Sequence, residues 1–148
     1  MGYREWFDQH GAKHRALVAK LAHLSDAELI AYFRYDNMVI HEPDFCPLYA
    51  EGKRCHTMED LNCYLCACPY FRFDDAGLDR SGERVRKSTC AIAAKEGAQI
   101  QHNDVIHQDC SACLLPHRTA FIAHRFDRDW FAIMAEVPPK ELPNETEV

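Results

Sequence analysis

Apolar residues recur at helical spacing near the start of the chain. Trp6, His10, Leu17, Leu21 and Leu24 are separated by three or four residues, or by sums of these intervals. This spacing places the five side chains on one face of an α-helix. The pattern therefore predicts a first helix that ends near residue 24.

A second helix is expected within the N-terminal segment, residues 1–42. Ser25 precedes an apolar run and is followed three residues later by Glu28, the spacing of a capping box at a helix start. Pro43 then ends any helical continuation. The N-terminal segment is thus predicted to be a helical pair, and the second helix has an apolar face formed by Leu29, Ile30 and Phe33.

The C-terminal part repeats the helical pattern. Pro116 suits a first helical turn, and the pattern predicts one helix over residues 117–137 that packs against the N-terminal pair. Its apolar stripe consists of Ile122, Phe126, Trp130, Ile133, Met134 and Val137. Residues 138–148 are rich in proline and acidic side chains, which predicts a flexible tail.

Between these helices, residues 44–117 lack apolar periodicity. This region holds all eight cysteines, and residues 74–87 within it have the polar composition of a long exposed loop. A region with so few regular apolar positions needs another source of stability, and bound metal can supply it. We therefore expect a small α-rich, metal-stabilised single domain over residues 1–137. In it an irregular cysteine-rich region packs against helices at both ends.

Composition and charge narrow the range of partners. The 148 residues include 47% hydrophobic and 27% charged side chains, which are ordinary values for a globular protein. The net charge is −6 and the basic residues are scattered, which argues against nucleic-acid binding. The sequence has no apolar run long enough for a membrane span, and its first residues lack the features of a secretory signal. These features predict a cytoplasmic protein of undefined oligomeric state that acts with a protein partner.

Cysteine is the unusual component of this composition. In a reducing compartment eight cysteines indicate metal binding before disulfides. Cys66 and Cys68 are separated by one residue, so a disulfide between them would be strained. A redox-active pair at Cys63 and Cys66 is a further alternative, although six additional thiols would interfere with it. The candidate metal ligands are Cys46, Cys55, Cys63, Cys66, Cys68, Cys90, Cys110 and Cys113.

Spacing suggests how these ligands divide. Two pairs have the two-residue gap that lets one tight turn direct two sulfurs at a single ion. We expect one centre to combine these pairs, "CYLC" and "CSAC", and the other to use the four remaining cysteines. This division separates Cys66 from Cys68 and so requires a turn between them. His56 and His117 are additional candidate ligands, because each follows a cysteine closely.

Residues 45–117 also resemble a known family. The motifs "FCPLY", "CH" at 55–56, "LNCYLCACPYF" and "DCSACLLPH" are similar to those of the cysteine-rich small domain, which is described as zinc-finger-like and metal-binding. In some prokaryotes a domain similar to this family is fused to a cobinamide amidohydrolase. The resemblance implies a prokaryotic cytoplasmic metalloprotein, with a cobalamin-related accessory role as one option, and it assigns no reaction.

Two kinds of metal centre fit the cysteines. Two zinc ions would give a structural or adaptor module, and this is the prediction that the paired gaps and the histidines favour. The alternative is a [4Fe–4S] cluster for electron transfer or redox sensing, which the all-cysteine set and the Cys-Pro step at 68–69 favour. The sequence has no catalytic triad, phosphate-binding loop or dinucleotide fingerprint, so we name no catalytic residue, and a metalloenzyme is the weaker alternative.

Overall fold

The computed structural model describes residues 2–137, and the predicted tail at 138–148 lies outside them. The described chain begins with three helices, where the sequence predicted two: α1 (Tyr3–Lys20), α2 (Asp26–Tyr32) and α3 (Tyr35–His41). The capping box is confirmed. The Ser25 hydroxyl accepts a hydrogen bond from the Glu28 amide at 3.2 Å, and the Glu28 carboxylate accepts one from the Ser25 amide at 2.9 Å.

An extended residue separates α2 from α3. Arg34 has an extended backbone and forms an isolated β-bridge with Asn62 of the cysteine-rich region. On either side of it, the Tyr35 amide donates to the Leu61 carbonyl and the Cys63 amide donates to the Phe33 carbonyl. These long-range hydrogen bonds replace helical ones, which explains why the predicted second helix is divided.

The prediction of an α-rich domain is wrong. The structure is a small mixed α/β domain with 37% helix and 17% strand over its described residues. A two-stranded antiparallel sheet pairs β1 (Phe71–Phe73) with β4 (Ser88–Cys90). A four-stranded sheet has the order β2-β3-β6-β5, in which β3 runs parallel to β6 and the other pairs are antiparallel. Its strands are β2 (Asp79–Ser81), β3 (Arg84–Arg86), β5 (Ala98–His102) and β6 (Val105–Asp109).

These strands were missed because they lack an apolar alternation. Every residue of β5 is exposed, so the strand presents no buried face that a sequence pattern could reveal. The exposed loop expected at 74–87 is instead largely a hairpin of β2 and β3, whose turn contains Gly82 at a φ of 67°. Glycine adopts this left-handed conformation without steric cost. Backbone pairing, not burial, defines this part of the fold.

The prediction of a single C-terminal helix is also wrong, although most of its predicted apolar stripe is buried. The segment forms a 3₁₀ turn η2 (Leu115–His117), then α4 (Thr119–His124) and α5 (Trp130–Ile133). The break has a local cause, because the Asp127 carboxylate accepts from the Asp129 amide and the Asp129 carboxylate caps α5 at the Phe131 amide. Five members of the stripe are buried, namely Ile122, Trp130, Ile133, Met134 and Val137.

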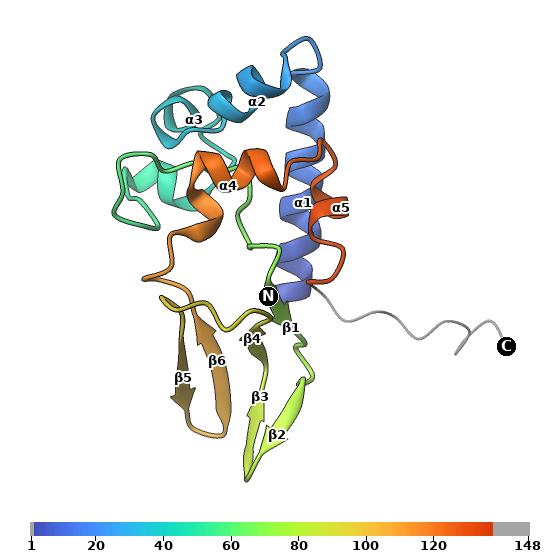
Figure 1. Cartoon of the computed structure of the whole chain (residues 1–148), viewed down its shortest axis with the longest axis vertical. Coiled ribbons are helices and arrows are strands. Elements are labelled where there is room, and N and C mark those ends of the chain that lie inside the picture. Colours follow the sequence, from blue (N-terminus) through green and yellow to red (C-terminus); the bar gives the residue numbers. More distant parts are fainter. Residues whose placement is uncertain (1, 138–148) are drawn as a thin grey trace, which may run out of the picture.

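The apolar core lies between the helices, and the sheets extend from one end of the helical part (Figure 1). The predicted packing of the C-terminal stripe against the N-terminal helices is confirmed by Phe7 of α1, whose ring centroid lies 4.7 Å from that of Trp130. Tyr64 and Leu65, from the middle of the cysteine-rich region, are fully buried in the same core. Part of this region is therefore stabilised by ordinary apolar packing.

Candidate metal centres

Four cysteines line one cavity at the junction of the helices and the loops that follow them. We call this space, of about 310 Å³ and partly open to solvent, the first thiol cavity. Cys46 immediately precedes the 3₁₀ helix η1 (Pro47–Glu51), and Cys55 lies in the loop beyond η1. The remaining two members, Cys63 and Cys66, belong to the segment that runs through the core.

The other four cysteines line a second cavity of about 210 Å³, the second thiol cavity. Cys68 begins the turn that leads to β1, and Cys90 is the last residue of β4. Cys110 follows β6, and the Cys113 amide donates to the Cys110 carbonyl at 3.1 Å, which closes the tight turn expected for "CSAC". Each cavity therefore collects four thiols, and together they account for all eight.

This grouping corrects the division expected from spacing. The structure places the "CYLC" pair with Cys46 and Cys55, and the "CSAC" pair with Cys68 and Cys90. Cys66 and Cys68 were expected to belong to different centres, and they line different cavities with a turn between them. Ala67 has a φ of 89° and Cys68 a φ of 54°, conformations that L-residues seldom adopt. The kink directs neighbouring cysteines into different cavities, so the thiols divide in chain order, four and four.

The thiols of each cavity influence one another electrostatically. Burial, followed in order of effect by the neighbouring Cys68, Cys113 and Cys90, raises the pKa of Cys110 to about 12. In the first cavity, partial burial of the sulfur of the otherwise exposed Cys55, followed by the nearby Cys63 and Cys46, raises the pKa of Cys55 to about 11. Four thiolates in either cavity would repel one another. A bound cationic centre would remove this repulsion and favour the ionised form.

Cys63 is the exception in the first cavity. Hydrogen bonding from the Cys66 thiol lowers the pKa of Cys63 despite its burial, and the Tyr49 hydroxyl lowers it further. That hydroxyl is buried and has no hydrogen-bond partner of ordinary geometry. Tyr49 thus supplies a polar group beside the sulfur within an otherwise apolar wall.

The spacing of the sulfurs bears on the kind of metal. A single zinc ion with four Zn–S bonds of about 2.3 Å holds its sulfurs about 3.8 Å apart. Within residues 2–137, no three thiols of one cavity have all their sulfurs within 4.8 Å of one another. In this part of the chain, the thiols of a cavity are thus not gathered in threes as closely as around one zinc ion, whereas a four-iron cluster has its ligands on four separate irons.

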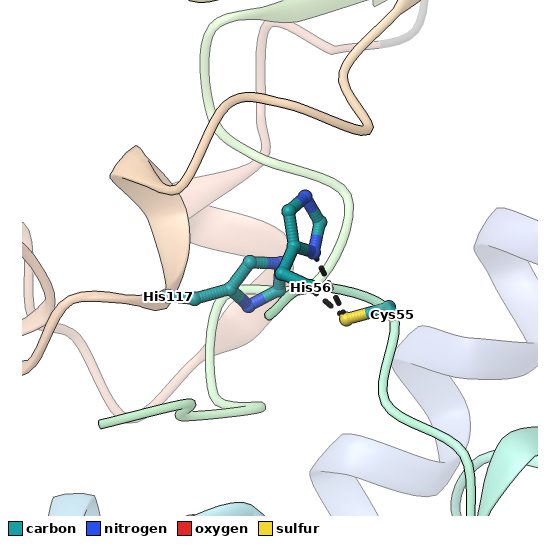
Figure 2. A group of neighbouring side chains, drawn as sticks. All are labelled: Cys55, His56 and His117. Atoms are coloured by element: carbon teal, nitrogen blue, oxygen red, sulfur yellow. Dashed lines mark hydrogen bonds between the residues drawn. The ribbon is translucent and has the colours of Figure 1, made fainter. Parts of the chain in front are cut away.

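A more compact group lies beside the first thiol cavity and consists of Cys55, His56 and His117 (Figure 2). The Cys55 sulfur lies 3.1 Å from His56 Nδ1 and 3.8 Å from His117 Nε2. On the opposite edge of each ring, His56 Nε2 donates to the Cys110 carbonyl and His117 Nδ1 donates to the Asn62 carbonyl, both at 2.9 Å. These bonds fix the tautomers, so both ring nitrogens near the sulfur carry lone pairs.

The surroundings keep His117 neutral. Its side chain is 4% exposed, and burial lowers its pKa to about 4 against the opposing effect of the Asn62 hydrogen bond. A neutral imidazole is the form that binds metal. Cys55 is exposed and His56 half-buried, so an ion can reach the group from solvent.

The two thiol cavities are adjacent. Tyr3, His56, Ala67 and His117 line both of them. Burial raises the pKa of the Tyr3 hydroxyl, and Cys66, Cys110 and Cys68 add to that effect, so thiols from both cavities lie near this residue. A single layer of side chains therefore separates the two groups of thiols.

Sequence reasoning missed three residues of this site: Tyr3, Tyr49 and Asn62. Asn62 could have been predicted from the sequence, because it interrupts the apolar run "LNCYL" and a buried polar residue in such a run has a hydrogen-bond partner. Its side-chain amide donates to the Ile30 carbonyl at 2.8 Å and accepts from the Tyr64 amide at 2.9 Å. Tyr3 and Tyr49 reach the site only through tertiary contacts, which no local pattern encodes.

Two further findings concern the class of protein. Within residues 2–137, none of the helices has the length and apolar character needed to cross a bilayer. No protein family, curated protein or solved structure matches the chain. The likeness to the cysteine-rich small domain therefore remains a prediction that rests on its motifs.

Proposed function

We propose that the protein binds two iron–sulfur clusters, one in each thiol cavity, and transfers electrons to or senses redox state for a partner protein. The observation that carries this proposal is the separation of eight thiols into two cavities with four in each. Four cysteine thiolates are the usual ligands of a [4Fe–4S] cluster. The proposal places the protein in a reducing compartment such as the cytoplasm, where the thiols stay available.

Three features favour clusters over zinc in these cavities. Within residues 2–137, no three sulfurs of either cavity are as close together as one tetrahedral zinc ion would hold them. The walls are largely apolar, with Leu61 and Tyr49 in the first cavity and Phe71 in the second, and a dry shell protects a cluster and sets its potential. The cysteine of the Cys-Pro step also belongs to a different cavity from the pair before it. The same division occurs in two-cluster ferredoxins.

The chain's own residues define what such centres can do. Each cluster would supply one-electron chemistry when bound. Four cysteine ligands per cluster leave no iron open to substrate, which favours electron transfer over catalysis at these two centres. The same argument supports a protein partner, since a carrier with closed centres must exchange electrons with another redox protein.

The proposal and the thiol division can be tested together by counting metal. Protein reconstituted without oxygen should contain iron and sulfide in equal amounts, and reduction with dithionite should give the electron paramagnetic resonance (EPR) signal of reduced clusters. Cys63→Ser and Cys113→Ser should each lose about half of the iron, because each removes one ligand from one of two centres. Ala112→Ser, which adds a hydroxyl beside Cys113 and removes no thiol, is the matched control and should keep all of it.

The double variant Cys63→Ser/Cys113→Ser separates the two possible divisions. If the cavities define the centres, it loses nearly all the iron. If the two-residue pairs shared one centre, the double variant would lose no more than either single variant. Full iron in both single variants, or zinc in place of iron in anaerobically prepared protein, would overturn the proposal.

A further inference from the structure

We propose that Cys55, His56 and His117 bind a divalent transition-metal ion, with zinc as the best match, and that the Cys55 sulfur bridges this ion to the centre in the first thiol cavity. The ion site stands on its own geometry. The bridge rests on the proposed function, because it requires a metal centre in that cavity.

The distances agree with one tetrahedral ion. Bonds of about 2.3 Å to sulfur and about 2.05 Å to nitrogen place these two atoms about 3.6 Å apart. The two sulfur–nitrogen distances are 3.1 and 3.8 Å and lie on either side of that value. All three ligand atoms lie within 4.8 Å of one another, and in the described part of the chain this is the only group of three metal-binding side chains that does so.

The hydrogen bonds behind the rings prepare them for this role. Metal-binding histidines characteristically donate their second N–H to a carbonyl or carboxylate, which fixes the tautomer and the orientation of the ring. Both His56 and His117 do so, and in Figure 2 both rings direct a nitrogen toward the Cys55 sulfur. The carbonyl that holds His117 belongs to Asn62, a residue that is 0% exposed and is itself fixed by two hydrogen bonds.

Cys55 belongs to both groups of ligands. It lines the first thiol cavity with Cys46, Cys63 and Cys66, and it is also the sulfur ligand of the compact group. A thiolate has more than one lone pair on sulfur and can bind two metals at once. The shared sulfur therefore joins the two sites without requiring a ninth cysteine.

Three protein ligands leave the ion with an open position. Catalytic zinc sites have this arrangement, with water or substrate as the fourth ligand. The exposure of Cys55 gives solvent access to that position. The ligand class that fits is water or a small anionic or thiol-bearing molecule, so the proposed ion would add a reactive site beside two closed electron-transfer centres.

Cobalt(II) is the probe for the ion site. We expect iron-loaded protein to take up one equivalent of Co²⁺ and to develop a thiolate-to-cobalt charge-transfer band with the visible bands of tetrahedral cobalt. His56→Ala and His117→Gln should each bind Co²⁺ at least tenfold more weakly than the parent while keeping their iron. His117→Gln retains a donor for the Asn62 carbonyl and so protects the fold. His124→Ala, at an exposed histidine of α4, is the matched control and should bind cobalt like the parent.

The outcomes separate the ion site from the proposed function. The site is overturned if iron-loaded protein takes up no cobalt, or if both histidine variants take up as much cobalt as the parent. The protein could also fail to hold iron and still bind cobalt through the two histidines. That result would support the ion site and overturn both the proposed clusters and the bridge. For the bridge itself, adding Zn²⁺ to the reduced, iron-loaded protein should change the cluster EPR spectrum in the parent and not in His117→Gln. An unchanged spectrum despite bound zinc overturns the bridge.

Discussion

Replacement of His10 by phenylalanine should stabilise the protein, and more so in acid. His10 lies on α1 and is 6% exposed among aromatic rings. Its ring stacks on Trp6 at 4.9 Å and contacts Phe45 and Trp130 edge-on at 4.9 and 5.3 Å. Its Nε2 atom is buried without a hydrogen-bond partner. Phenylalanine retains a flat ring in this position and removes the unpaired polar atom.

The magnitude follows from the pKa of His10. Burial, with a smaller effect from the nearby Lys13, lowers this pKa from 6.5 to about 4. The folded protein therefore keeps His10 neutral, whereas the unfolded chain binds a proton below pH 6.5. Proton binding by the unfolded chain reduces the free energy of unfolding as pH falls from 6.5 toward 4. At about 1.36 kcal/mol per pH unit, this reduction is about 2 kcal/mol at pH 5.

Removal of the unpaired nitrogen adds a gain that does not depend on pH, on the order of 1 kcal/mol. We therefore expect His10→Phe to raise the free energy of unfolding by about 1 kcal/mol at pH 7 and about 3 kcal/mol at pH 5. Anaerobic urea unfolding followed by circular dichroism measures both values. Metal bound in the thiol cavities would contribute equally to parent and variant, so its pH dependence would cancel in the difference.

The same substitution at an exposed histidine is the control. His23 is an exposed residue beyond the end of α1, and His23→Phe should leave the pH dependence of unfolding unchanged. If His10→Phe gives the same stability difference at pH 7 and pH 5, or if His23→Phe reproduces its effect in acid, then His10 is not held neutral by burial and the reasoning fails.

Substitutions at two further positions test the local structure. Asn62→Leu should lower the free energy of unfolding by about 2–4 kcal/mol in urea titrations. It leaves the buried Tyr64 amide unpaired and removes one of the two hydrogen bonds to the Ile30 carbonyl, which keeps the bond from the Phe33 amide; a loss below about 1 kcal/mol would contradict these bonds. Ser25→Ala should cost about 1 kcal/mol by the same measurement through loss of the capping box, and Ser25→Asp should restore most of it. Failure of Ser25→Asp to recover stability would show that the cap is not the cause.

The sequence predicted those parts of the fold in which burial follows a regular period. The apolar stripes of the terminal helices and the capping box at Ser25 are present in the structure. The sequence pattern did not reveal the helix boundaries, because Arg34 pairs with the distant Asn62 and the Asp129 side chain caps a new short helix, α5. The strands could not be predicted, since β5 is exposed throughout and is defined by pairing with β6 alone.

The candidate ligands were readable from composition, whereas their grouping was not. Gap lengths identify which cysteines can share a turn, but they do not fix which turns face the same cavity. Here the positive φ angles at Ala67 and Cys68 decide the grouping, and no glycine marks this kink in the sequence. The pairing of His56 with His117 likewise depends on a contact between residues far apart in the chain, with their ring centroids 4.4 Å apart.

The two thiol cavities also differ in what holds their ligands in place. Cys63 and Cys66 flank Tyr64 and Leu65, which are fully buried in the helical core, so apolar packing fixes these two ligands before any metal binds. In the second cavity, Cys90 and Cys110 lie at the ends of strands that contribute little to that core. If residues 44–117 depend on metal as expected, that dependence should be uneven. A centre in the first cavity would enter a site that the fold has already formed, whereas a centre in the second would itself supply much of the free energy that joins the sheets to the helices.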